Sequence, residues 1–140
     1  MKRYLLILTA LVSLIACEPR IELDESQWEN KAEITNMFIY RMQVDEVELS
    51  DGTKTKGVKK VTVSTKYEVD SDAATVTITL PADVDRSALS CYIYHTGESI
   101  TPLENAPVPG ELSDWSSNSY KFRVNTVGAE YKDWTINIIE

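Results

Sequence analysis

The side chains in this sequence that could perform chemistry are one histidine, two cysteines and several aspartate pairs. A Ser-His-Asp arrangement needs a histidine to accept the nucleophile's proton, yet His95 stands directly before Thr96 and Gly97, which indicate a turn. Paired carboxylates could act as acid and base only if the two groups had separated pKa values and lay across a cleft. Adjacent turn residues rarely provide this, so the sequence predicts no enzyme and no catalytic residues.

The aspartates in "EVDSDA" and "ADVDRS" are also poor metal ligands. Calcium prefers clustered oxygens, but the glycine and distal glutamate of a helix-loop-helix calcium site are missing. Zinc prefers cysteine and histidine, which are too few here. We predict no metal and no cofactor, with a fortuitous calcium as the alternative. Short side chains that bond to nearby backbone in turns explain Asp70, Asp72, Asp83 and Asp85.

Cys91 lies in "ALSCYIY", where Leu89, Cys91 and Ile93 alternate on one face of a predicted strand. Free cysteine often behaves as a small buried hydrophobe, so we expect Cys91 in the core, with a reactive thiol as the alternative. No disulfide framework is predicted, because the other cysteine, Cys17, ends an apolar leader.

Tyr92 and Tyr94 should point away from that face, so two tyrosines would lie on an outer surface of the sheet. A pair of flat, amphipathic rings can stack on the apolar face of a sugar or on a protein partner. They are therefore candidate ligand-binding residues. The alternative is that they only support the sheet as cross-strand neighbours. Trp134, in phase with Ile136 and Ile138, is expected in the core.

The stretch from Tyr4 to Cys17 is too short to span a bilayer, which needs roughly 20 apolar residues. It has a basic start at Lys2 and Arg3 and a small residue, Ala16, before a cleavage point. This pattern is typical of an export signal. We expect residues 1–16 to be a signal peptide.

The letters "LIAC", which end at Cys17, resemble the lipobox of bacterial lipoproteins. The resemblance implies that Cys17 receives a diacylglycerol and becomes the first residue after cleavage. Two or three acyl chains such as palmitate would hold the chain on the membrane stably, unlike a single chain. An ordinary secretory signal with an incidental cysteine, or a short core helix, is the alternative. We expect lipid anchoring in the bacterial outer membrane.

Residues 17–31 follow, with Cys17 and most of the polar stretch "EPRIELDESQWENKAE", which has no sustained period and is rich in acids. We expect a tether. Its interrupted acids loosely resemble the surface-export signals of Bacteroidetes-type lipoproteins, which would imply a cell-surface location. Trp28 is a third candidate ligand-binding residue, although an aromatic residue at this point can also pack against the domain edge.

The acidic balance excludes one class of partner. The chain has 14 basic and 22 acidic residues and a net charge of −8, and loss of Lys2 and Arg3 with the leader makes it more acidic. Nucleic-acid binding depends on Lys and Arg displacing counterions from phosphates, so we predict no nucleic-acid partner. The remaining length suits one domain, residues 32–140.

From residue 33 the apolar pattern has period two, which predicts strands rather than helices. In "KVTVSTKYEV", Val61, Val63, Thr65, Tyr67 and Val69 would share one half-buried face, and this strand should pair with "TVTITLP" as a hairpin. About seven strands are predicted: 33–42, 44–49, 58–69, 75–80, 89–95, 119–125 and 131–139. They favour an antiparallel β-sandwich of immunoglobulin type, with a small β-barrel as the alternative.

Residues 32–140 resemble the immunoglobulin-like domains of uncharacterised function found in Bacteroidetes-type surface lipoproteins. The resemblance rests on "AEITNMFI", "TVTITLPADVDRSALSCYIYHTGESITP" and "DWSSNSYKFRVNTVGAEYKDWTINI". It implies that Trp115, in the aromatic-Ser segment, is a core residue. The sequence departs from the pattern at the last turn, where Val127, Gly128 and Ala129 replace a common Asp-Gly pair.

Two functions from different classes remain. The first is a non-catalytic interaction or structural module that docks onto an envelope protein. The second is a small glycan-binding lipoprotein, accessory to polysaccharide capture, with Tyr92, Tyr94 and Trp28 as its platform. An open edge strand or apolar patch favours the first, and solvent-facing aromatic side chains with polar neighbours favour the second.

Overall fold

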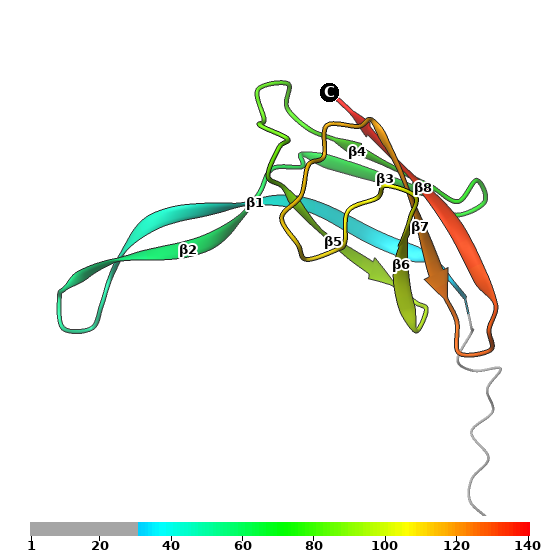
Figure 1. The fold of residues 1–140 in the computed structure, drawn as a ribbon, viewed down its shortest axis with the longest axis horizontal. Coiled ribbons are helices and arrows are strands. Elements are labelled where there is room, and N and C mark those ends of the chain that lie inside the picture. The colour runs from blue at the N-terminus through cyan, green and yellow to red at the C-terminus, as the bar shows by residue number, and fades with distance from the viewer. Residues whose placement is uncertain (1–30) are drawn as a thin grey trace, which may run out of the picture.

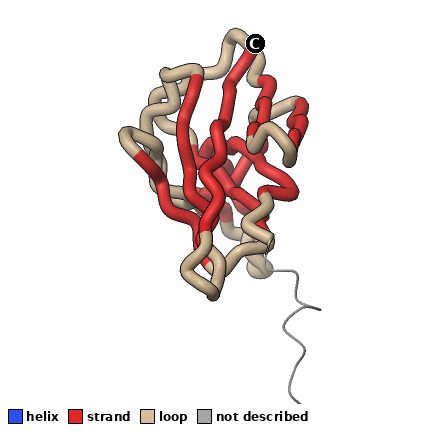
Figure 2. Tube along the Cα trace, turned by 90° about the vertical axis from the view of Figure 1, so that its right-hand side faces the viewer, coloured by secondary structure: helices blue, strands red, loops and turns tan. Residues whose placement is uncertain are grey.

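The computed structural model describes residues 31–140, which form two stacked β-sheets without a helix (Figures 1 and 2). The strands of the first sheet have the order β2-β1-β5, and those of the second have the order β3-β4-β8-β7-β6. The strand bounds are β1 Ile34–Glu48, β2 Lys54–Thr62, β3 Lys66–Asp70, β4 Thr75–Thr79, β5 Ser90–His95, β6 Ser99–Leu103, β7 Ser119–Asn125 and β8 Tyr131–Ile139.

Neighbouring strands are antiparallel except for β4 and β8, which run parallel. The predicted all-β sandwich is therefore confirmed, and the barrel alternative is wrong, because the described strands form two separate sheets. Within this part of the chain there is no helix with the length and apolarity that crossing a bilayer requires.

The core lies between the sheets and is built from alternate residues of the strands, as period two requires. Cys91, Trp115 and Trp134 expose no surface, which confirms all three as core residues. The indole Nε1 of Trp134 donates a hydrogen bond to the carbonyl oxygen of Ala32 at 2.8 Å, so this buried polar atom is satisfied. The same bond holds the start of the domain against the second sheet.

β1 is one continuous strand, and the predicted division into 33–42 and 44–49 is wrong. The expected break fell at Gln43, but this residue is no turn former and the period-two pattern continues through it. The first half of β1 pairs with β5 and the second half with β2. Tyr40 is the point of exchange, because it lies opposite both Ser90 and Thr62.

The second half of β1 and all of β2 project from the sandwich as a hairpin, which we call the arm and define as residues 41–62 (Figure 1). Every side chain of the arm is exposed or half-buried, and none belongs to the core. A two-stranded hairpin has little stability by itself in water, so the arm depends on β1 for its attachment.

The predicted strand 58–69 is wrong, because the chain passes from one sheet to the other at residues 63–65. The backbone N–H groups of Val63 and Ser64 donate to the carbonyl oxygen of Ile39 at 2.9 and 3.3 Å, and the next N–H, that of Thr65, donates to Thr79 in the second sheet. The residues up to Thr62 are in β2, whereas Tyr67 is in β3. The predicted hairpin with the following strand is correct for β3 and β4.

The remaining differences concern sheet edges. β6 was not predicted, because it is short and contains Pro102, which lacks a backbone donor. Its position at the end of the second sheet explains why proline is tolerated there. β7 and β8 have the predicted bounds, 119–125 and 131–139.

Candidate binding surface

The two candidate tyrosines of β5 lie on the outer face of the first sheet, as the alternation predicts. Tyr92 is 51% exposed and Tyr94 is 48% exposed, whereas Cys91 and Ile93 on the same strand are buried. β5 forms this pattern because one face packs on the core and the other meets solvent.

The tyrosines belong to a larger group of rings, which we call the aromatic cluster: Phe38, Tyr67, Tyr92 and Tyr94. The ring centroids of Tyr92 and Tyr94 are 4.8 Å apart. Phe38 meets Tyr94 and Tyr67 edge-on, with centroids 6.0 Å apart in both pairs. β1, β3 and β5 therefore contribute to one surface, in the edge-to-face arrangement that aromatic rings prefer.

Polar groups border the aromatic cluster. Asn36 lies opposite Tyr94 in the β1–β5 ladder. The hydroxyl of Thr35 donates to the carbonyl oxygen of Tyr94 at 3.3 Å. Flat rings with amide and hydroxyl groups beside them suit a sugar ring, which has an apolar face and polar edges. They also suit a protein side chain.

Sequence reasoning found two of the four rings. Phe38 could have been added, because Met37 and Ile39 are core residues and strict alternation turns the residue between them outward. Tyr67 could not, because the predicted strand 58–69 gave no sign that the chain changes sheets before Tyr67. Trp28 and Cys17, the other candidate residues, lie outside the residues that the structure describes.

The Cys91 thiol and the His95 imidazole are the other potentially reactive groups, and burial affects both. Burial raises the pKa of the Cys91 thiol to about 12, so this cysteine is not a thiolate at neutral pH. His95 ends β5, and its Nδ1 is buried without a hydrogen-bond partner within residues 31–140. A general base needs a partner that orients its ring. Such a partner is missing at Nδ1.

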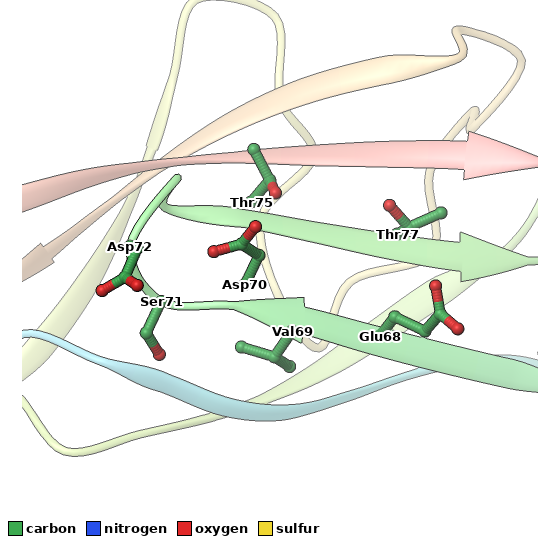
Figure 3. A pocket seen from close by; sticks show the side chains of 7 residues that line it. All are labelled: Glu68, Val69, Asp70, Ser71, Asp72, Thr75 and Thr77. Carbon is green, nitrogen blue, oxygen red and sulfur yellow. The ribbon is translucent and has the colours of Figure 1, made fainter.

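A shallow acidic hollow of about 610 Å³ lies beside the hairpin of β3 and β4 (Figure 3). Glu68 and Asp70 lie opposite Thr77 and Thr75 in the ladder, and their carboxylates point to the same side of β3 in Figure 3. Lys66 donates a hydrogen bond to Glu68 and lowers the pKa of this carboxyl group. Within residues 31–140, no group of three or more acidic, histidine or cysteine side chains could hold a metal ion.

Two of the four predicted turn aspartates act as expected. The backbone N–H of Ala73 donates to Asp70 Oδ1 at 3.0 Å, and that of Ser87 donates to Asp85 Oδ1 at 2.9 Å. Hydrogen bonding from the backbone and the side chain of Ser87 also lowers the pKa of the Asp85 carboxyl group. Of these two aspartates only Asp70 lines the hollow, and its role in the turn explains its position there.

The arm is the second exposed feature of this sheet. Val44 and Val58 lie opposite each other on its outer face and are 63% and 61% exposed. β2 contains four lysines and no acid, whereas the arm half of β1 contains three acids, Asp45, Glu46 and Glu48. The arm thus offers an acidic strand, a basic strand and exposed aliphatic side chains, which is not the composition of a core.

The sequence matches the family model described as DUF5018-related over residues 34–137, which include the arm, the aromatic cluster and most of β8. The chain belongs to the DUF5018-related family. Among solved structures, the DUF5018-related domain resembles the crystal structure of a candidate secreted protein from Bacteroides fragilis NCTC 9343. The two chains are 24% identical with a TM-score of 0.59, and the match covers 78% of this chain and 94% of the other.

At this identity the likeness establishes the fold of the DUF5018-related domain and nothing more. No curated protein matches the sequence. The immunoglobulin-like classification and the lipobox stay predictions.

Proposed function

We propose that this chain is an exported, lipid-anchored, non-catalytic interaction module of the bacterial outer membrane. Export is supported by the leader sequence of residues 1–16 and by the candidate secreted protein that shares the fold. Anchoring is supported by the resemblance of "LIAC" to a lipobox. A non-catalytic role is supported by the buried Cys91 thiol and by the surroundings of His95.

The observation that carries the interaction role is the arm. Its strands extend past the sandwich, contribute nothing to the core and leave aliphatic side chains such as Val44 and Val58 in water. Val44 and Val58 are neighbours across the β1–β2 ladder, and contiguous exposed apolar side chains are typical of interaction sites.

Lipid anchoring is tested by labelling with an alkyne analogue of palmitate in a bacterium that processes lipoproteins. The parent chain should take up the label and fractionate with the outer membrane. Cys17→Ala should lose both properties, whereas the matched control, Cys91→Ala, should retain them. Equal labelling of the parent and Cys17→Ala would remove the anchor from the proposal.

The interaction role is tested by placing a photo-crosslinking amino acid at single exposed positions of the full chain. Val44 and Val58 report on the arm, and Val127, which is more exposed than either, is the control at the turn between β7 and β8. Illumination of intact outer membranes should give discrete protein adducts from the two arm positions. No adducts, or adducts as frequent at Val127, would contradict the proposed function.

The aromatic cluster favours a second function, binding of a glycan. We infer that Tyr92 and Tyr94 would provide the stacking surface and that Asn36 and Thr35 would border it. Removal of both rings by Tyr92→Ala and Tyr94→Ala should weaken polysaccharide binding about tenfold or more, because each stacked ring contributes roughly 1 kcal/mol.

Affinity electrophoresis of the full chain in detergent through a panel of immobilised polysaccharides provides the measurement. Tyr131→Ala is the matched control, because Tyr131 is also exposed but lies outside the aromatic cluster. The Cζ atom of Arg123 is 3.7 Å from the centroid of its ring. Retardation that is equal for the parent and the double variant would argue against this site. A panel without retardation would argue against glycan binding.

A further inference from the structure

The outer edge of β2 is open. β2 ends the first sheet, and β5 pairs with the opposite edge of β1, so the free edge of β2 points away from the sandwich. β2 has no proline, and its nine residues pair with β1 in one unbroken register. Alternate backbone N–H and C=O groups along the free edge therefore have no strand to bond to within residues 31–140. Such an edge is a template for an added strand.

Lysines usually protect an edge strand by projecting past it, but three of the four lysines in β2 are held over β1 instead. Lys59 forms an ion pair with Asp45. Lys60 Nζ lies 5.0 Å from the ring centroid of Tyr40. Lys54, the third, is 3.8 Å from Glu46 through its Nζ and Oε2 atoms. Because all of these partners belong to β1, the lysine head groups leave the backbone of the free edge accessible.

The pairing of β2 with β1 shows that negatively charged side chains fit opposite the lysines of β2. Along the arm, Lys54 lies opposite Glu48 and Lys56 lies opposite Glu46. Opposite charges across a ladder stabilise the pairing, and like charges destabilise it. Lys56 forms no ion pair within residues 31–140, so its charge remains available. A strand on the second side of β2 meets the same lysines as β1 does.

A second copy of the chain does not fit this edge well. Antiparallel pairing of two β2 strands about Val58 would place Lys56 of one copy opposite Lys60 of the other. The free edge therefore favours an acidic strand from another protein.

We propose that the free edge of β2 binds an extended acidic segment of a partner protein by β-strand addition. Lys54, Lys56 and Lys60 share the outer face of the arm, so the partner should have carboxylates at every second residue on that face. Val58, on the same face, would contact the methylene groups of the glutamate side chain opposite it. This inference depends on the proposed function, because it specifies the partner of the arm.

The test uses the full chain in detergent micelles and three synthetic nine-residue peptides. The first alternates glutamate with valine, the second alternates lysine with valine, and the third is the glutamate peptide with N-methylated backbone amides. Backbone amide NMR should show slower hydrogen exchange at residues 54–62 with the glutamate peptide alone. The N-methylated peptide should fail, because it cannot donate ladder hydrogen bonds.

Charge reversal provides the matched variants. Lys54→Glu with Lys56→Glu should weaken the glutamate peptide about tenfold and improve the lysine peptide, because two attractive cross-strand pairs become repulsive. Lys121→Glu, on the exposed face of β7, should change neither affinity. Equal binding of both peptides, or protection outside residues 54–62, would overturn the inference. A molecular mass that doubles with concentration would overturn it in favour of a second copy.

The outcome can be separated from that of the proposed function. Adducts from Val44 and Val58 together with no binding of the glutamate peptide would overturn strand addition but leave the interaction role intact. If neither Val44 nor Val58 gave adducts, both strand addition and the interaction role would be overturned.

Discussion

At the scale of single residues, the last turn shows a conflict between backbone conformation and side chain. Ala129 adopts a φ of 63°, in the left-handed region, which costs a residue with a Cβ roughly 1 kcal/mol. The sequence places its glycine one position earlier, at Gly128. The departure from the Asp-Gly pattern noted in the sequence therefore has an energetic consequence.

We expect Ala129→Gly to raise the free energy of unfolding by about 0.5–1 kcal/mol, because glycine adopts a positive φ without strain. Chemical denaturation of the parent and the variant provides the measurement. Ala82→Gly is the control, because Ala82 is exposed and has no positive φ, so glycine there should be neutral or destabilising. A loss of stability in Ala129→Gly would show that the turn does not have this conformation.

A second effect at this scale depends on pH. Arg123 donates from Nε and NH2 to the two carboxylate oxygens of Asp133 at 2.7 and 2.8 Å, and this lowers the pKa of Asp133 from its usual 3.8. A carboxyl group with a lowered pKa in the folded state stabilises the fold above its unfolded pKa, and this contribution disappears as the pH falls through the folded value.

Asp133→Asn should therefore be less stable than the parent at pH 7, and the difference should shrink as the pH falls below 3.8. Urea unfolding of both proteins across this range provides the measurement. Glu130→Gln is the control: Glu130 is exposed in the turn before β8, three residues from Asp133, and its replacement should have a smaller effect. A difference that stays constant with pH would show that the ion pair does not contribute to stability.

At the scale of elements, the connection between β5 and β6 depends on a close backbone approach. A Cβ at Gly97 would overlap the carbonyl oxygen of Asn125 and a methyl group of Val124 in β7. The backbone N–H of the following residue, Glu98, donates to the same carbonyl oxygen at 2.7 Å. Only glycine allows β5 and β6 to join so close to β7.

Gly97→Ala should lower the free energy of unfolding by about 2 kcal/mol, because a rigid backbone atom must move. Gly57→Ala is the matched control. Its Cβ would meet only the exposed side chain of Val47, which can rotate, so the loss should be less than about 1 kcal/mol. Thermal unfolding followed by tryptophan fluorescence would separate the two variants. Equal losses would refute the close approach at Gly97.

Period-two reasoning succeeds where a strand has one buried face and fails where the chain changes sheets. It placed β7 and β8 correctly because their alternation ends at turn signals. It joined β2 to β3 because alternation continues through residues 63–65, where no glycine or proline marks the crossing. Of the aromatic cluster, the rings on β1 and β5 follow from phase, whereas Tyr67 depends on packing between sheets.

At the scale of the whole molecule, the arm and the sandwich should be separable. No residue between 41 and 62 belongs to the hydrophobic core. Replacement of residues 42–60 by Asn-Gly, a favoured two-residue hairpin turn, would keep the Arg41–Val61 pair and close β1 directly onto the end of β2.

We expect this variant to keep its near-ultraviolet circular dichroism and to unfold within about 5 °C of the parent, because its core is unchanged. It should lose any crosslinking or peptide binding that depends on the arm. The control, Ile136→Ala, leaves a cavity in the core instead. It should lower the melting temperature clearly, since Ile136 is fully buried. If the truncated variant failed to fold, this would show that the sandwich needs the arm in order to fold.

The continuity of β1 has a mechanical consequence. One strand leads from Ile34, next to the segment that would reach the membrane, to the base of a hairpin that would hold a partner. Tension between the two would pass along the backbone of β1 and across its ladder with β2, the strand that would hold the partner. Because ladder hydrogen bonds are perpendicular to the strands, such a pull loads them together in shear rather than one after another. If the anchor and the partner are as proposed, a pull between them would meet the covalent backbone of β1 and a sheared β1–β2 ladder.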